Sequence, residues 1–265
     1  MDPLSSTQSL DARRAGTLGC ALMALAAFRA SPSEIPGLRK APDEPGGFSV
    51  HPSLLRHADE QTVAGLAAVY RAIRRSGLDP AGFADWSVLV APRYLGRAAF
   101  ERAFPIFREE GAWGVSPHLI PAHSLHSPSG TISQALKAHG PNLGIGGTPG
   151  GVREALLCAA TWLGSGIAPG VWVVLIGRIE ESDGTAEAGD YEALALALVP
   201  EEIAPDAPVL RVSPEGVDLA AFGDDSSPSL ARWLAPGSLR LDAPEPGGSV
   251  PRPHFRPPAS RVEEV

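Results

Sequence analysis

Short runs of consecutive apolar residues constrain the fold of this chain most strongly. Trp86–Val90 and Val171–Gly177 are almost free of polar residues, and each is far shorter than the ~20 residues that a membrane-spanning helix needs. Such runs are typical of strands covered on both faces, as in sheets that carry helices on each side. Two further strands are predicted over Leu143–Gly147 and over Glu192–Val199, where a strict alternation ends at Pro200. We therefore expect an α/β fold in which helices cover a β-sheet.

Segments with helical spacing lie between these predicted strands. The best marked begins after Asp59, which can cap a helix N-terminus, and ends at Gly77, a typical C-terminal stop. Shorter helices are predicted over Ser129–His139 and Gly151–Leu163. Gly96–Glu110 also has a helical pattern, but its internal proline predicts a break.

Proline and glycine mark the irregular parts of the chain. The 29 glycines and 27 prolines exceed one residue in five of the 265, and they cluster in residues 31–52 and after Pro205. Residues 31–52 and the aperiodic segment Val115–Ser127 are therefore expected to be loops. We expect a frayed N-terminus over 1–14, a domain over 15–204, and a proline-rich, largely irregular or disordered tail over 205–265.

The apolar segment Ala15–Phe28 follows two arginines and has some features of an export signal. Against export, no cleavage site of small residues is clear, and Arg29 and two proline turns follow at once. We favour a buried strand and helix, with an export signal as the alternative. The two cysteines, Cys20 and Cys158, are too few for a disulfide framework or a zinc cluster, so a reduced, cytoplasmic setting is expected.

The balance of charge excludes one large class of partner. Lys and Arg number 22 against 30 Asp and Glu, for a formal net charge of −8, and the basic residues form no block. A surface that binds nucleic acid by neutralising phosphates needs clustered basic residues. We therefore expect no nucleic-acid partner, and because no apolar run reaches ~20 residues, we expect no membrane span.

A glycine-rich turn between a predicted strand and a predicted helix is the first candidate site. It runs from Gly146 to Gly151 and contains Thr148, Pro149 and Gly150. A sharp strand-to-helix turn can display a nucleophile beside the backbone N–H groups of a helix N-terminus. Many such turns are glycine-rich for structural reasons alone, so the turn by itself does not establish catalysis.

Several short motifs lead up to this turn and include it. They are Ser116-Pro117, Pro121, Ser129-Gly130, Gly140-Pro141-Asn142 and the turn at 146–151. Their order and spacing resemble the N-terminal half of β-ketoacyl synthases. Further upstream, residues 51–56 and the helix after Asp59 are similar to the short, chain-length-factor-like variant found in aryl-polyene-type gene clusters. The resemblance covers roughly residues 50–200 and implies a thiolase-like fold, with a mixed β-sheet covered by helices, of which this chain would hold the first half.

The resemblance also implies that the turn has lost its catalytic groups. The family's nucleophilic cysteine falls on Pro149, which has no thiol and lacks the N–H that is one of the family's two oxyanion donors. The family's catalytic histidines belong to its C-terminal half, where this chain has only His254. The resemblance therefore implies a degenerate, non-catalytic protein. Its vestigial nucleophile elbow consists of Thr148, Pro149, Gly150 and Gly151.

Other reactive side chains are less convincing as catalytic or metal-binding groups. Cys158 follows the elbow on the predicted helix, but an apolar setting raises the pKa of a thiol and makes it inert. The histidines at 118, 123, 126 and 139 lack a helical metal-binding spacing, so we expect no metal and no cofactor. The resemblance suggests an acyl tunnel or a subunit interface near the elbow. The candidate residues for it are His126, Ser129, Gly130, Leu143 and Ile145.

The resemblance implies a partner subunit of the chain-length-factor type in fatty-acid or polyketide-type biosynthesis. The expected partner is an active ketosynthase in a heterodimer, with a homodimer as the alternative, and an acyl carrier protein is a further candidate. Two other functions stay open. One is residual acyltransferase or decarboxylase activity on carrier-bound acyl groups. The other is a binding or scaffold protein that reuses the fold and recognises its partner through the proline-rich tail.

Overall fold

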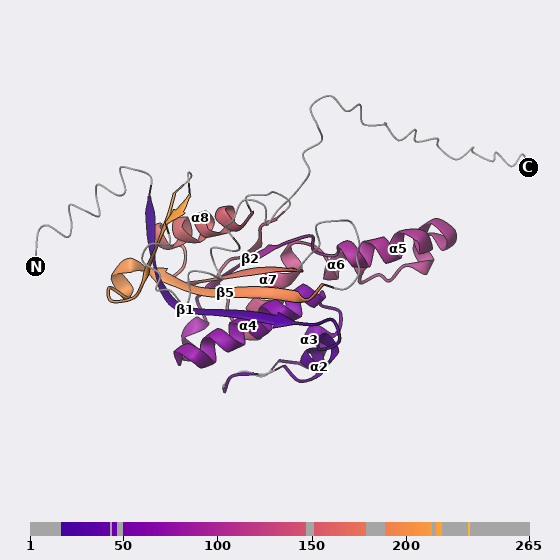
Figure 1. Cartoon of the computed structure of the whole chain (residues 1–265), viewed down its shortest axis with the longest axis horizontal. Helices are drawn as coiled ribbons and strands as arrows, with labels where there is room; N and C mark the ends of the chain where they lie inside the picture. Colours follow the sequence, from indigo (N-terminus) through magenta and orange to yellow (C-terminus); the bar gives the residue numbers. More distant parts are fainter. Residues whose placement is uncertain are drawn as a thin grey trace, which may run out of the picture.

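The structure, a computed structural model, describes residues 17–42, 44–46, 50–146, 151–178, 189–213, 216–218 and Trp233. These residues contain a seven-stranded sheet with the order β3-β2-β4-β5-β1-β6-β7 (Figure 1). The strands are β1 Leu18–Ala30, β2 Ser87–Pro92, β3 Asn142–Gly144, β4 Val171–Arg178, β5 Tyr191–Pro200, β6 Val209–Val212 and β7 Val217–Asp218. The α-helices are α2 Ile35–Lys40, α3 Pro52–Arg56, α4 Glu60–Ser76, α5 Arg97–Glu110, α6 Leu119–Ala122, α7 His126–Leu136 and α8 Gly151–Gly164. The short 3₁₀ helices are η1 Pro80–Phe83, η2 Gly111–Gly114 and η4 Glu201–Ile203.

The sheet is mixed, as the resemblance to β-ketoacyl synthases implied. β2 pairs in parallel with β3 and with β4, whereas β4, β5, β1, β6 and β7 pair in antiparallel fashion with their neighbours. Parallel strands require crossover connections, which the helices between β2 and β3 and the helix α8 between β3 and β4 provide. This topology leaves the short strand β3 at one edge of the described sheet.

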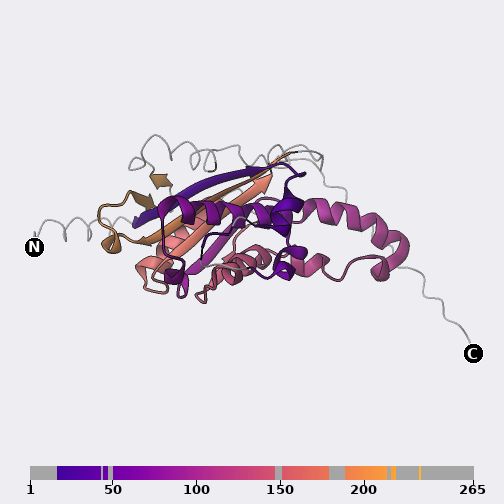
Figure 2. The same ribbon diagram turned by 90° about the horizontal axis from the view of Figure 1, so that it is seen from below.

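Helices cover both faces of the sheet (Figures 1 and 2). α4 and α7 pack on one face, and α8 packs on the other. α4 begins at its predicted cap, because Asp59 Oδ1 accepts a hydrogen bond from the N–H of Gln61 at 2.8 Å. It ends at Gly77, whose φ of 68° lies in the left-handed region that glycine adopts without strain.

Each face of the sheet has its own hydrophobic core. In the central strand β4, Val174 points into the core under α4 and α7, and Leu175 points into the core under α8. Both side chains are fully buried. All six residues of β2 are buried as well, which confirms that the two apolar runs form strands covered on both faces.

The predicted helix within residues 15–30 is wrong. β1 is a single strand of 13 residues that pairs with β5 from Cys20 to Ala30 and with β6 at its beginning. Its alanines favour a helix when considered alone, but pairing with strands distant in sequence overrides that local preference. The predicted strand over Glu192–Val199 is confirmed as β5.

Helices also occur where prolines led us to expect loops or a break. Residues 31–52 contain α2, whose Pro36 lies in the first helical turn, where the missing N–H has no intrahelical partner to lose. Val115–Ser127 contains α6 and the start of α7. α5 continues through Pro105 without a break. The backbone carbonyl one turn before Pro105 belongs to an exposed residue, so water can solvate it.

The sheet extends beyond residue 204, where we placed the end of the domain. Leu210 and Val212 in β6 are fully buried, and β7 pairs with β6. Residues 1–14, the acidic segment 179–188 and, apart from Trp233, everything after residue 218 lie outside the described residues. Among the helices that are described, none is both long enough and apolar enough to cross a bilayer.

Candidate functional site

The predicted nucleophile elbow falls largely outside the described residues. Thr148, Pro149 and Gly150 belong to the undescribed segment 147–150, so their placement at the apex of the turn stays a prediction. Gly151 is buried at the first position of α8. The strand and the helix that the prediction placed on either side of this segment are present: β3 precedes it and α8 follows it.

Three of the predicted tunnel or interface residues lie in the first turns of α7. Ser129 is buried, and its hydroxyl donates to the backbone carbonyl of His126 at 3.0 Å and to Oδ1 of Asn142 at 3.4 Å. The His126 ring lies over Gly130, where an added Cβ would be 3.7 Å from Nε2. These residues therefore form the junction between α7 and the edge strand β3.

The other two predicted residues lie on the opposite face of the same edge. Leu143 is in register with Leu89, whose side chain belongs to the core under α8. Leu143 is nevertheless 41% exposed, because the described sheet ends at β3. Ile145 donates its N–H to the carbonyl of Val90 at 2.8 Å and packs against the core under α8. The five residues thus share one edge of the sheet and do not line a single pocket.

Neither cysteine is in an environment that activates a thiol. Cys158 is half-buried on α8, and burial raises its pKa. Cys20 is fully buried in β1, where burial and, to a lesser extent, the charge of Glu201 raise its pKa to about 12. A nucleophilic cysteine requires the reverse shift, toward the thiolate. The predicted inertness of Cys158 agrees with this direction.

The histidines of the matched segment have structural contacts. His118 stacks on His57 with ring centroids 4.2 Å apart, and His123 lies 3.6 Å from Asp59. The described residues contain no group of three or more side chains that could hold a metal ion. What these contacts do is connect the segment after β2 to the residues that precede and cap α4.

A projecting helical arm is the feature that the sequence analysis missed. We define the arm as residues 97–122, which comprise α5, η2 and α6. Among the described elements, α5 projects from one end of the sheet and its covering helices (Figures 1 and 2). No residue of α5 is buried. The described part of the chain has nine exposed large hydrophobic side chains, and five of them belong to the arm. They are Phe104 (65% exposed), Ile106, Phe107 (54%), Trp113 (99%) and Ile120 (64%).

Two further exposed apolar side chains lie at the sheet edge and in the segment that connects it to the arm. Leu125, which is 43% exposed, lies between α6 and α7, and its backbone packs directly against Gly144 of β3. Leu143 of β3 is the next exposed apolar side chain. We call the arm together with Leu125 and Leu143 the arm–edge surface. Monomeric proteins seldom expose this many large apolar groups in one region, and such regions usually contact another molecule.

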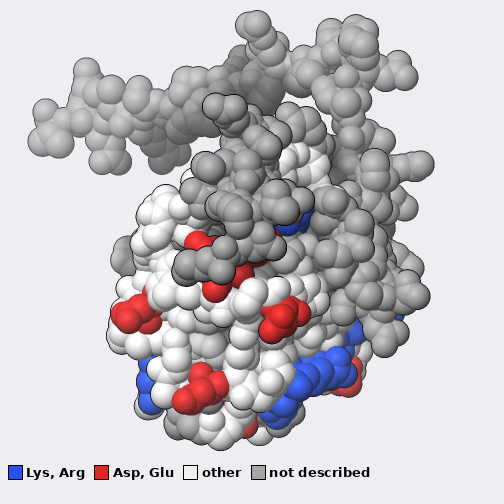
Figure 3. Space-filling view, turned by 90° about the vertical axis from the view of Figure 1, so that its left-hand side faces the viewer, with Lys and Arg blue, Asp and Glu red and all other residues white. Residues whose placement is uncertain are grey.

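The charges around this surface favour a protein over a polyanion. α5 carries three arginines and three glutamates, so it has no net charge, and Arg97 and Glu101 pair at 3.0 Å. At the end of the molecule opposite α5, which Figure 3 shows, acidic and basic side chains also occur together. Neither region resembles the clustered basic surface that binds nucleic acid or anionic lipid.

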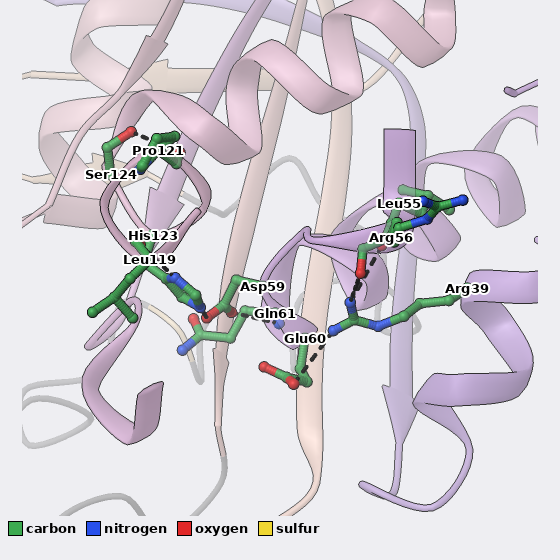
Figure 4. A network of polar contacts seen from close by, with 10 residues as sticks. All are labelled: Arg39, Leu55, Arg56, Asp59, Glu60, Gln61, Leu119, Pro121, His123 and Ser124. Carbon is green, nitrogen blue, oxygen red and sulfur yellow. Dashed lines mark hydrogen bonds and ion pairs between the residues drawn. The ribbon is translucent and has the colours of Figure 1, made fainter. Parts of the chain in front are cut away.

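The base of the arm is fixed to the body by polar contacts (Figure 4). The N–H of Gly96, which precedes α5, and the N–H of Gln61 both donate to the Asp59 carboxylate. His123, which follows α6, approaches the same carboxylate. Arg39 of α2 pairs with Glu60 at 3.3 Å and donates to backbone carbonyls at the end of α3. The N-terminus of α4 is therefore where α2, α3 and both ends of the arm meet.

Comparison with known proteins identifies the fold. No protein-family model and no curated protein matches the chain. One similar solved structure is a type II polyketide synthase acyl-carrier protein in complex with its ketosynthase bound to the hexaketide. The match has a TM-score of 0.54 and 16% identity, and it covers 73% of this chain and 67% of the matched chain. Another is the ishigamide ketosynthase/chain length factor. This match has a TM-score of 0.51 and 16% identity, and it covers 72% of this chain and 64% of the matched chain.

The chain spans about two thirds of the length of these two matched chains. The match includes an α/β architecture with a mixed sheet between helical layers, as the resemblance in the sequence implied. This chain therefore has an α/β fold of the kind found in these ketosynthase structures.

Proposed function

We propose that this protein is a non-catalytic, ketosynthase-like subunit that pairs with an active ketosynthase, in the manner of a chain-length factor, in fatty-acid or polyketide-type biosynthesis. The observation that carries the proposal is the arm–edge surface. It combines an open strand edge at β3 with large apolar side chains that nothing in the described chain covers.

The composition of this surface is suited to a protein interface. Exposed phenylalanine and tryptophan side chains are frequent anchors of interfaces, because each removes a large apolar area from water when it enters a pocket of the partner. Trp113, at 99% exposure, has nearly all of its area available for such burial. An edge strand can in addition pair its backbone with a strand of a second subunit.

The non-catalytic part of the proposal rests on the sequence. By resemblance to β-ketoacyl synthases, Pro149 takes the position of the acyl-accepting cysteine and leaves neither a thiol nor an N–H there. The raised pKa of the half-buried Cys158 gives no support for a substitute nucleophile on α8.

The partner is proposed from the assemblies that share the fold. The two similar structures are a ketosynthase with an acyl-carrier protein and a ketosynthase/chain length factor. We extend pairing of the second kind to this chain and propose that the active ketosynthase covers the arm–edge surface. A second copy of this chain is the alternative occupant, and an acyl carrier protein is a further partner of the assembled pair.

Co-expression with an active ketosynthase of an aryl-polyene-type or type II system tests this proposal. We expect a stable 1:1 complex by size-exclusion chromatography with light scattering. Phe107→Glu and Trp113→Ala should each weaken it by at least about 30-fold, because loss of a central aromatic anchor typically costs about 2 kcal/mol or more. The proposal would be contradicted if the chain stayed monomeric or bound only itself when co-expressed with each of these ketosynthases.

A matched control separates the arm–edge surface from exposed apolar groups in general. Ile203 in η4 is 67% exposed, like Ile120. η4 directly follows Pro200, which pairs with Cys20 near the start of β1, at the end of the sheet away from α5 (Figure 1). Ile203→Glu should leave the affinity for the ketosynthase unchanged. Mass spectrometry after incubation with malonyl or acyl carrier protein should detect no acyl adduct, and an adduct on Cys158 would overturn the non-catalytic part.

A further inference from the structure

The two ring nitrogens of His123 have different partners. Nδ1 lies 2.8 Å from the backbone carbonyl oxygen of Leu119. A carbonyl oxygen only accepts hydrogen bonds, so Nδ1 must carry a proton and donate it. Nε2 then faces Oδ2 of Asp59 at 3.6 Å (Figure 4).

This geometry determines how many protons the pair needs. If His123 were neutral and Asp59 ionised, a nitrogen lone pair would face a carboxylate lone pair. The contact is attractive only when one more proton is present, either on Nε2 or on the carboxyl group. Water cannot easily enter and bridge the two lone pairs instead, because the side chains of His123 and Asp59 are only 14% and 7% exposed.

We propose that Asp59 and His123 share one proton that locks the arm to the N-terminus of α4, and that loss of this proton at alkaline pH loosens the arm. The lock joins the residue after α6 to the cap of α4, and Gly96 at the start of α5 donates to the same carboxylate. Both ends of the arm therefore depend on one buried carboxyl group. That the lock also orients a partner-binding surface rests on the proposed function.

The net effect of the surroundings on the pKa of Asp59 is upward, the direction that the lock requires. Burial is the main cause that raises the pKa of Asp59, and the charge of neighbouring Glu60 raises it further. The N–H groups of Gln61 and Gly96 and the charge of His123 oppose the rise. Arg39 from α2 neutralises part of the Glu60 charge. Burial raises the pKa of Tyr191 in β5, which is also close enough to Glu60 and Asp59 for their charges to raise it further. Arg178 of β4 and Arg102 of α5 lower it.

The sign of the pH dependence follows from the shared proton. A carboxyl group whose pKa is raised by folding stabilises the folded state fully at pH values below its unfolded pKa. That contribution is lost as the pH rises through the pKa of the folded state. The neighbouring His57–His118 stack has the opposite sign, because burial and the charge of His118 lower the pKa of His57. The alkaline side of the profile therefore reports on the Asp59–His123 pair.

Hydrogen exchange on the full chain tests the lock. As the pH rises from about 6 to about 9, we expect protection factors in α5 and α6 to fall about tenfold. Those in the core of α4 and in β4 should stay constant. Because protection factors are corrected for the intrinsic pH dependence of exchange, arm protection that does not change with pH would overturn the proposal without any variant.

Asp59→Asn provides the decisive variant. Its amide can still accept from Gln61 and cap α4, and it can donate to Nε2 of neutral His123, so the contact no longer needs a shared proton. We expect the arm to lose its pH dependence in this variant. Asp79→Asn is the matched control, since Asp79 Oδ1 likewise accepts from the N–H two residues later, at 3.0 Å, but caps η1. The control should retain the wild-type profile.

NMR of the wild-type chain counts the proton directly. At pH 7 we expect the Nδ1 of His123 to be protonated, together with either a protonated Nε2 or a neutral Asp59 carboxyl group. A neutral ring beside an ionised carboxylate would overturn the proposal. None of these measurements includes a ketosynthase, so the lock can fail while the proposed pairing holds, and the reverse.

Discussion

α4 and α5 are similar in sequence pattern and opposite in environment. α4 has 17 residues, and 11 of them are buried against the sheet and its neighbours. α5 has 14 residues with apolar side chains at comparable spacing, and none of them is buried. Phe100 and Phe104 follow one another along α5 with ring centroids 6.2 Å apart, yet no core lies beneath Phe104.

The difference shows what an amphipathic pattern means. Such a pattern indicates that one side of a helix is to be covered, but it does not say by what. For α4 the cover is the sheet of the same chain. For α5 we propose that the cover is a second subunit. The comparison predicts that substitutions in α4 lower the stability of the isolated chain, whereas substitutions in α5 lower its affinity for the second subunit.

The largest expected effect is on the stability of the isolated chain. Leu66 of α4 is 1% exposed, and Leu66→Ala should lower the free energy of unfolding by about 2–5 kcal/mol, because it removes buried methyl groups and leaves a cavity. Phe107→Ala in α5 should change it by no more than about 0.5 kcal/mol. Urea denaturation measures both. Equal losses would mean that the free chain already buries α5.

Terminal glycines of the two helices give a second, smaller contrast. Gly77 after α4 and Gly96 before α5 both have positive φ angles, 68° and 74°. An added Cβ at Gly77 meets nothing within 4 Å, whereas at Gly96 it would lie 2.6 Å from the Cβ of His123. Gly77→Ala should cost about 1–2 kcal/mol for the left-handed backbone. Gly96→Ala should cost more, because the arm must also shift.

Proteolysis distinguishes where the damage from these two substitutions falls. Limited digestion of Gly96→Ala should cut first between α5 and α6, while Gly77→Ala should show no selective cleavage in the arm. The same cleavage pattern in both variants would contradict the view that Gly96 holds the arm.

The smallest expected effect is a pH dependence confined to α4. Tyr70 is fully buried, and burial, followed by the charge of Glu44, raises its pKa above the ordinary value. Its contribution to stability should be complete below about pH 10 and should be lost as the pH rises toward its folded-state pKa. An absorbance titration of tyrosinate should contain a late component that Tyr70→Phe removes. Persistence of this component in the variant would contradict its assignment to α4.

Local signals in the sequence were sufficient where neighbouring residues determine the structure. The cap at Asp59, the stop at Gly77 and the covered strand β4 were all predicted, because each depends on a few adjacent residues. The helix predicted within 15–30 is part of strand β1, because pairing with β5 and β6 is set by residues more than 150 positions away. Pro105 did not break α5, since an exposed helix can hydrate the carbonyl that proline leaves unbonded.

The candidate site was predictable only in part. The resemblance singled out Ser129 of α7 and Leu143 of β3, which the structure places at one edge of the sheet, and their role stays a prediction. It gave no sign that five of the nine exposed large apolar side chains of the described residues would belong to the arm. The sequence of α5 is equally compatible with a buried helix, because exposure depends on what the rest of the fold leaves uncovered. The proton shared by Asp59 and His123 was likewise invisible, since 64 residues separate the two groups.

Hydrogen exchange with and without an active ketosynthase tests the central claim most directly. If the arm–edge surface binds the partner, protection should rise in α5, α6 and β3 on complex formation and should stay unchanged in η4, around Ile203. Protection that appears elsewhere, with the arm still exchanging as in the free chain, would contradict the account.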